Sequence, residues 1–119
     1  MDIKDMQVNA HRNATDKGFH NLEHSILNKM LINNVFTSEE YNAVLNAFMG
    51  LGLMLIVSEA SEALEARRKN DEDNFGEEIC DVAIRLGDFS ENYGVDLDGE
   101  IVKKMGINKL RDKMHGKKF

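Results

Sequence analysis

The 119-residue sequence contains no proline, and this absence, together with the spacing of its apolar residues, restricts the possible folds most strongly. Proline kinks or ends helices, so a chain without it can form long uninterrupted ones. Apolar residues recur at steps of three and four almost throughout, as in amphipathic helices, whereas strand-like alternation is scarce. The sequence therefore predicts an all-α fold, a helical bundle of about four to five helices.

The same spacing gives approximate boundaries for the helices. We expect helices over Ile3 to Thr15, Phe19 to Asn33, a stretch that starts near Ser38, Leu51 to Lys69, Asp73 to Tyr93, and Asp96 to about Met114. Thr37 and Glu40 are three residues apart and have the form of a capping box. Gly94 suits the left-handed residue that closes a helix, and Asp96 suits the cap of the next one.

Two glycines lie within the longest apolar stretch. Gly50 and Gly52 each disfavour helix by about 1 kcal/mol relative to alanine, so we expect a break or kink there. The polar stretch Asn70 to Asn74 is expected to form a turn between two helices. The helices on either side of this turn should then pack antiparallel.

Length and composition indicate a single soluble domain over residues 1–119. The chain can bury one core, and its 42% apolar and 30% charged residues are typical of globular proteins. Met1 to Val8 lacks the basic flank and apolar stretch of a signal peptide. The single cysteine, Cys80, excludes an intramolecular disulfide and is expected to be a small packing residue in a cytoplasmic protein.

The apolar run from Ala43 to Val57 is shorter than the roughly 20 residues that cross a bilayer. We interpret it as core or subunit interface and expect no membrane association. Because the segment around Leu51 to Val57 is apolar on all sides, one small subunit is not expected to cover it. A homodimer or a homotetramer, formed as a dimer of dimers, would do so. The net charge of -6 argues against a nucleic acid polymer as partner.

Four acidic residues form two pairs with the same spacing. Glu59 and Glu62 are three residues apart, as are Glu78 and Asp81, so each pair lies on one face of its helix. If the two helices pack antiparallel, the four carboxylates meet across one groove. Their mutual repulsion would be relieved by a hard divalent cation, and Mg²⁺ suits oxygen ligands best. Either pair alone is weak support, since most charged rows are solvated faces.

The C-terminal segment is basic. Lys104, Asn108, Arg111 and His115 follow steps of four, three and four residues, which places them on one face if the last helix persists. Such a set could hold a polyphosphate and a sugar hydroxyl. The alternative is a solvent-exposed amphipathic surface without a ligand, and the spacing alone does not distinguish the two interpretations.

Several of these segments together resemble the MazG-like nucleotide pyrophosphohydrolases. They are the stretch from Leu55 to Arg67 with Glu59 and Glu62, the stretch Glu77 to Asp81, the Lys104, Asn108 and Arg111 series with the terminal His115 to Phe119, and His11 to Phe19. The resemblance covers Leu53 to the C-terminus well. Residues 19–52 do not match it, and Gly106, Ile107 and Asp112 depart from the usual pattern.

The resemblance implies a Mg²⁺-dependent enzyme, with Mn²⁺ as a possible substitute. The reaction would be hydrolysis of nucleoside triphosphates, deoxynucleotides foremost, between the α and β phosphates to give a monophosphate and pyrophosphate. Glu59, Glu62, Glu78 and Asp81 would be the metal ligands, and Glu62, or Glu59 beside it, would activate the attacking water. Lys104, Asn108, Arg111 and His115 would bind the substrate.

Other classes of function fit the sequence less well. A ferritin-like di-iron bundle needs Glu-x-x-His, which the two acidic helices lack. His20 and His24 have metal-ligand spacing, but Glu23 does not complete the zinc-hydrolase motif, so we expect surface or interface histidines. The alternative that stays open is a non-catalytic helical module for nucleotide binding or oligomerisation.

Overall fold

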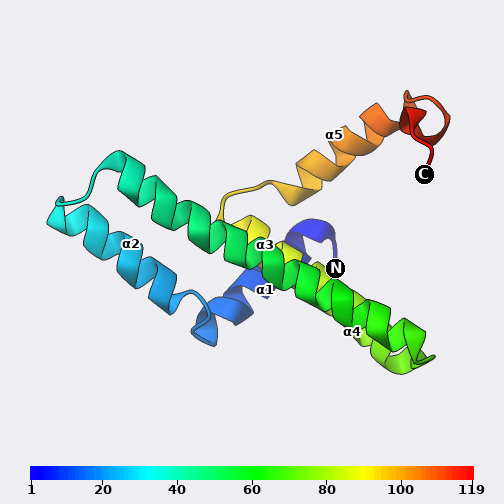
Figure 1. The fold of residues 1–119 in the computed structure, drawn as a ribbon, viewed down its shortest axis with the longest axis horizontal. Coiled ribbons are helices and arrows are strands. Elements are labelled where there is room, and N and C mark those ends of the chain that lie inside the picture. Colours follow the sequence, from blue (N-terminus) through cyan, green and yellow to red (C-terminus); the bar gives the residue numbers. More distant parts are fainter.

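The computed structural model describes residues 1–119 and contains five α-helices followed by one short 3-10 helix. The elements are α1 (Ile3–Asp16), α2 (Asn21–Asn33), α3 (Ser38–Arg68), α4 (Glu72–Asn92), α5 (Leu97–Lys109) and the 3-10 helix η1 (Lys113–Gly116). The predicted all-α fold is confirmed. Figure 1 shows α3 as the longest element, with α2 along its first half and α4 along its second half.

The α3–α4 hairpin forms the centre of the molecule (Figure 1). The two helices are joined by a tight turn in which Asn70 adopts a left-handed conformation, with φ of 56°. Asp71 caps α4, because its Oδ1 accepts a hydrogen bond from the Asn74 amide at 3.2 Å. The short connection forces α4 to run back antiparallel along α3, as the polar turn in the sequence predicts.

Two of the predicted helix ends are confirmed by their hydrogen bonds. The Glu40 amide donates to Thr37 Oγ1 at 3.0 Å, and the Thr37 amide donates to Glu40 Oε1 at 2.9 Å, which completes the capping box. Asp96 Oδ1 accepts from the Gly99 amide at 3.3 Å at the start of α5. Gly94, with φ of 71°, follows the end of α4.

The expected break at Gly50 and Gly52 is wrong, because α3 is continuous from Ser38 to Arg68. The reason lies in the packing of α4 against α3. A Cβ atom added at Gly52 would lie 2.7 Å from Cδ2 of Phe89, so the glycine allows this aromatic ring to lie directly on the α3 backbone. The contact between the two helices outweighs the low helix propensity of glycine.

A second close approach joins α1 to α4. A Cβ atom at Gly87 would meet Met6 Sδ at 2.7 Å and Gln7 Cα at 3.3 Å. Gln7 is only 1% exposed, and its Nε2 donates to Glu91 Oε2 at 2.7 Å and to the Val95 carbonyl at 2.8 Å. These contacts hold α1 against the second half of α4.

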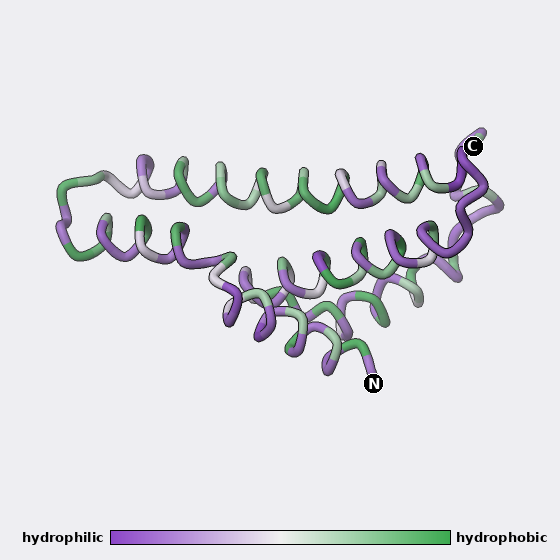
Figure 2. The backbone as a smooth tube through the Cα atoms, turned by 90° about the horizontal axis from the view of Figure 1, so that it is seen from below, coloured by the Kyte–Doolittle hydropathy of each residue, from purple (hydrophilic) through white to green (hydrophobic).

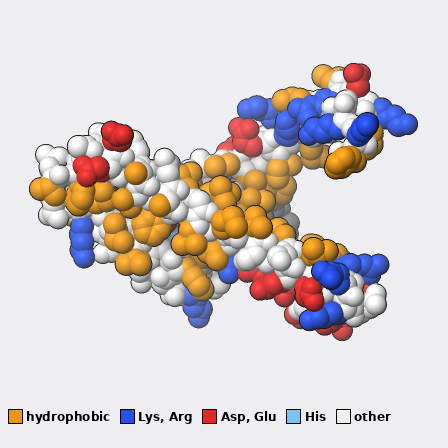
Figure 3. All heavy atoms as spheres, in the orientation of Figure 1, with side chains coloured by type: hydrophobic (Ala, Val, Ile, Leu, Met, Phe, Trp, Pro, Cys, Tyr) orange, Lys and Arg blue, Asp and Glu red, His pale blue; other side chains and the backbone are white.

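The molecule is open, and much of its apolar surface faces outward. Only 9 of the 119 residues are buried, and the principal extents are 51 × 36 × 29 Å. In Figure 2, α2 runs beside the first half of α3 as an arm, and both carry many apolar residues. Figure 3 shows the resulting band of hydrophobic side chains along these helices. Leu51, Leu53, Met54 and Val57 are all more than half exposed.

By length and composition, α3 is the one helix that could cross a membrane. This is weak evidence for a membrane span, because core helices of soluble proteins pass the same test.

Cys80 in α4 is exposed, so the expectation of a small packing residue is wrong for the single chain. Ile79, which precedes it, is also exposed.

The last helix is shorter than expected. It ends at Lys109 rather than near Met114, and a turn and the 3-10 helix follow. Met114 and His115 have φ of 59° and 51°, which is incompatible with a continuous α-helix. The helix α5 packs mainly on α1 and extends away from the α3–α4 hairpin (Figure 1).

Candidate functional site

Three of the four predicted carboxylates meet between α3 and α4. Oxygen atoms of Glu59, Glu78 and Asp81 lie within 4.8 Å of one another. Glu59 comes from the middle of α3, while Glu78 and Asp81, three residues apart, share one face of α4. The antiparallel packing of the hairpin therefore brings an acid from α3 to an acidic pair on α4.

Glu62 lies beside this group and not within it. Its side chain is exposed, one turn of α3 beyond Glu59. It is nevertheless close enough for its charge to act on Glu78. The structure thus places all four residues in one region, but it gathers the carboxylates of only three.

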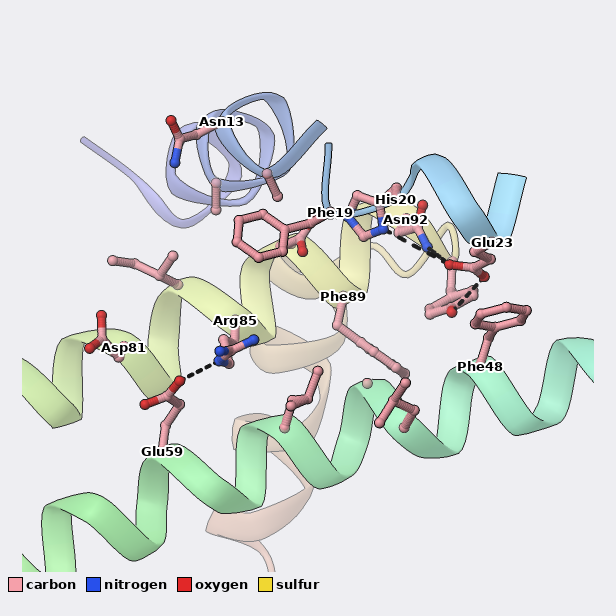
Figure 4. Close-up of a pocket in the computed structure, with 18 of the residues that line it drawn as sticks. Asn13, Phe19, His20, Glu23, Phe48, Glu59, Asp81, Arg85, Phe89 and Asn92 are labelled. Carbon is pink, nitrogen blue, oxygen red and sulfur yellow. Dashed lines mark hydrogen bonds and ion pairs between the residues drawn. The ribbon is translucent and has the colours of Figure 1, made fainter. Parts of the chain in front are cut away.

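Arg85 is a member of the site to which the sequence assigned no role. Its guanidinium forms an ion pair with Glu59 across the two helices (Figure 4). This hydrogen bond is the main reason why the pKa of Glu59 lies below its usual range. Arg85 follows Asp81 by four residues and so shares its face of α4, which was the available signal in the sequence.

The pKa of Glu78 is shifted in the opposite direction from that of Glu59. Desolvation, followed by the neighbouring Glu62, Asp81 and Glu59, raises the pKa of Glu78 from 4.5 to about 7. Its Oε2 atom is buried and has no hydrogen-bond partner. A buried carboxyl oxygen without a partner, beside other carboxylates, fits a divalent cation that takes oxygen ligands. Glu59, Glu78 and Asp81 are therefore the residues that could hold such an ion.

Two members of the acidic group, Glu59 and Asp81, line one end of a groove of about 500 Å³. This volume is typical of sites for small organic ligands. The groove runs between α3 and α4 and is partly covered by the residues from α1 to the start of α2 (Figure 4). Its apolar lining includes Phe19, Leu22, Phe48, Leu51, Leu55, Ile84 and Phe89.

Polar residues line the other end of the groove. Glu23 of α2 is buried and accepts hydrogen bonds from Tyr93 Oη at 2.7 Å and from Asn92 Nδ2 at 3.2 Å. Burial and the adjacent Glu23 carboxylate raise the pKa of Tyr93. Glu23 was missed as a site residue in the sequence, because α2 lies in the part of the chain that the family resemblance does not cover. The position of Glu23 among the apolar residues of an amphipathic helix was the only signal.

The expectation for His20 and His24 as surface or interface residues is only half right. His24 is exposed, but the His20 side chain is only 12% exposed and its Nε2 lies 2.7 Å from Asp88 Oδ1. His20 therefore packs against α4 inside the single chain. It also lines the groove together with Asp88.

The basic row is not brought to the carboxylates within one chain. None of Lys104, Asn108, Arg111 and His115 lines the groove. Lys104 and Asn108 are in α5, whereas Arg111 and His115 follow its end and so do not continue a helical face. Arg111 Nη1 lies 3.4 Å from His115 Nδ1, and Asn108 Oδ1 is buried without a hydrogen-bond partner. Figure 3 shows Lys and Arg side chains gathered on the α5 arm.

The groove therefore offers a carboxylate group at one end, an apolar middle and a polar far end. Such a site could bind a cation together with a ligand that has a charged and an apolar part. Comparison of the chain with protein-family models, with curated proteins and with solved structures finds no match.

Proposed function

We propose that the protein is a Mg²⁺-dependent nucleoside triphosphate pyrophosphohydrolase. The observation that carries the proposal is the meeting of Glu59, Glu78 and Asp81, two of which, Glu59 and Asp81, line the end of a ligand-sized groove. The partnerless Oε2 of Glu78 supports a cation at this point. The resemblance of the same residues to the MazG-like pattern supports the reaction class.

In the proposed reaction, Glu59, Glu78 and Asp81 would hold Mg²⁺, or Mn²⁺ in its place. When bound there, the ion would neutralise charge on the phosphates and acidify water. Glu62, at the exposed edge of the site, accepts a proton from the attacking water. Water attacks the α phosphorus, the bond to the bridging oxygen breaks, and pyrophosphate leaves with that oxygen.

The rest of the groove suits the nucleoside. Its apolar middle, with Phe19 and Phe89, can hold a base by stacking and burial of apolar surface. Arg85, on the groove wall beside Glu59, has guanidinium donors that match phosphate oxygens. Binding at both ends would keep the triphosphate in position for attack, which is the main requirement of this chemistry.

We propose further that the functional unit is a homodimer or a homotetramer. The chain exposes 9020 Å², whereas a folded monomer of this mass exposes about 6,500 Å². Its radius of gyration is 17.7 Å, against about 13.5 Å for a compact domain of this length. The excess surface is about 2,500 Å², which is enough for an obligate interface. A second copy on the apolar band of α2 and α3 would cover it.

The oligomer would also complete the substrate site. In one chain the basic residues of the α5 arm lie away from the carboxylates, so we propose that Lys104, Asn108, Arg111 and His115 reach the groove of a second copy. The apolar band would then be covered by protein in the cytoplasm and not by lipid. Purification without detergent as a discrete oligomer is the expected outcome; recovery only from the membrane fraction would contradict it.

Release of pyrophosphate from a panel of nucleoside and deoxynucleoside triphosphates tests the activity. We expect Mg²⁺-dependent release by the parent protein and at least a hundred-fold loss (about 2.7 kcal/mol) with Asp81→Asn or Glu62→Gln. Glu77→Gln, a neighbouring exposed acid, is the matched control and should keep full activity. Unchanged activity in Asp81→Asn would disprove the site.

One observation favours a second candidate, a non-catalytic nucleotide-binding or oligomerisation module. Glu59 is already neutralised by Arg85 in the single chain, so part of the acidic group is satisfied without a metal. Equilibrium binding of a non-hydrolysable triphosphate analogue, without pyrophosphate release from any triphosphate in Mg²⁺ or Mn²⁺, would favour this candidate.

A further inference from the structure

Three of the four histidines in the chain gather at one place outside the acidic group. His11 comes from α1, His20 directly precedes α2, and His24 is in its first turn. The ring centroids of His11 and His20 are 5.1 Å apart, and those of His20 and His24 are 5.7 Å apart. Segments that are distant in sequence thus bring imidazole groups together against α4.

Two of the imidazoles converge on one carboxylate oxygen. His11 Nδ1 lies 2.9 Å and His20 Nε2 lies 2.7 Å from the same atom, Oδ1 of Asp88. One possible ligand atom from each of His11, His20 and Asp88 lies within 4.8 Å of the other two. All three side chains are at most a quarter exposed, so their positions are held by the helices around them.

The charge around this group is negative. The only basic groups within 4.0 Å of Asp88 or Glu23 are histidines, because the nearby Arg85 pairs with Glu59. Glu23 is buried, held by Tyr93 and Asn92, and its Oε2 lies 3.9 Å from His20 Nδ1. At 3.9 Å this contact is too long for a hydrogen bond, so Glu23 adds negative charge behind His20 without fixing the orientation of the ring.

We propose that His11, His20 and Asp88 bind a divalent transition-metal ion of the zinc class. Two imidazole nitrogens and one carboxylate are a ligand set that such ions prefer over Mg²⁺, and a tetrahedral ion keeps a fourth position for water. Ligand atoms around zinc are about 3.3 Å apart, so small side-chain rotations would open the present contacts. The ion would join α1 and the start of α2 to α4.

This site is separate from the carboxylate site. Asp88 follows Asp81 by seven residues, which is about 10 Å along the helix axis. Arg85 lies between the two positions on the same face of α4. One chain would therefore hold a hard cation at Glu59, Glu78 and Asp81 and a transition-metal ion at the histidines.

The test uses the full-length protein with Cys80→Ser, so that the exposed thiol cannot bind metal. Metal-free protein is titrated with Zn²⁺ by calorimetry in excess Mg²⁺, and Co²⁺ is used to record the visible absorption of a tetrahedral site. We expect one Zn²⁺ per chain and at least a ten-fold weaker affinity in His11→Gln, His20→Gln and Asp88→Asn. His115→Gln and Glu78→Gln should bind as the parent does.

Glutamine removes the imidazole ligand in His11→Gln, but its amide can still donate a hydrogen bond to Asp88 and preserve the contact between the helices. A loss of Zn²⁺ affinity in this variant therefore reports on the ligand and not on unfolding. Far-ultraviolet circular dichroism checks that each variant is folded. Absence of stoichiometric Zn²⁺ binding by the parent would show that the cluster is only a hydrogen-bonded contact between helices. Binding that survives in His11→Gln, or that is lost in Glu78→Gln, would equally overturn the site.

Discussion

Arg85 of α4 forms an ion pair with Glu59 of α3 at the centre of the acidic group. This pair supplies the positive charge for one carboxylate and leaves Glu78 without a partner. Arg85→Gln should therefore lower the free energy of unfolding without metal by about 1 kcal/mol, a value reduced by the partial exposure of the guanidinium. The stabilisation by Mg²⁺ should become larger, because the ion then relieves more repulsion. Thermal melts with EDTA and with Mg²⁺ measure both effects, and Arg85→Lys should be intermediate.

The raised pKa of Glu78 predicts a pH dependence of stability. Between its ordinary pKa of 4.5 and the folded value of about 7, the folded state binds more protons at this site than the unfolded state does. The contribution of Glu78 to stability is therefore fully present below pH 4.5 and is lost as pH rises through about 7. Melts in EDTA from pH 4.5 to 8 should show a smaller decline for Glu78→Gln than for Glu77→Gln. Equal declines would contradict the environment assigned to Glu78.

Addition of Mg²⁺ should stabilise the folded protein by mass action. At a concentration one hundred times the Kd the gain is about 2.7 kcal/mol, which raises the Tm by several degrees. Asp81→Asn removes one ligand and should abolish most of this shift. A Tm shift that is the same in Asp81→Asn and in the parent would place the ion elsewhere.

The two glycines in α3 should respond to substitution in opposite directions. Gly50 has no neighbouring atom within 4 Å of an added Cβ, so Gly50→Ala should stabilise the helix by up to about 1 kcal/mol. Gly52→Ala would clash with Phe89 and should destabilise by about 1 to 3 kcal/mol. Urea denaturation of both variants measures the difference. A stabilising Gly52→Ala would mean that α3 and α4 are not in close contact there.

A site shared between copies can be tested by mixing two inactive variants. Asp81→Asn lacks a carboxylate, and Arg111→Ala lacks a basic residue of the α5 arm. If each site combines one residue from each copy, mixed dimers have one intact site, and an equal mixture should regain about a quarter of the parent activity. Co-refolding followed by the pyrophosphate assay measures this recovery. No recovery, with mixed dimers shown by native mass spectrometry, would place both residues in one copy's site.

The local parts of the fold could be predicted from the sequence. The missing proline and the helical spacing determine the all-α class, and the Thr37 and Glu40 capping box determines where α3 begins. The three-residue spacing also determines that Glu78 and Asp81 share a face. These features depend on contacts within a turn or two of helix, so nearby residues contain all the necessary information.

The tertiary structure decided how the helices face one another. The register of α4 on α3, with Phe89 over Gly52, gathers Glu59 with Glu78 and Asp81, leaves Glu62 at the edge of this group, and pairs Glu59 with Arg85. The same packing carries α3 through both glycines. It also gathers histidines from α1 and α2, and it leaves the basic arm pointing away. Each of these features depends on contacts between residues far apart in the chain. The spacing of neighbouring residues contains no information on the energies of such contacts.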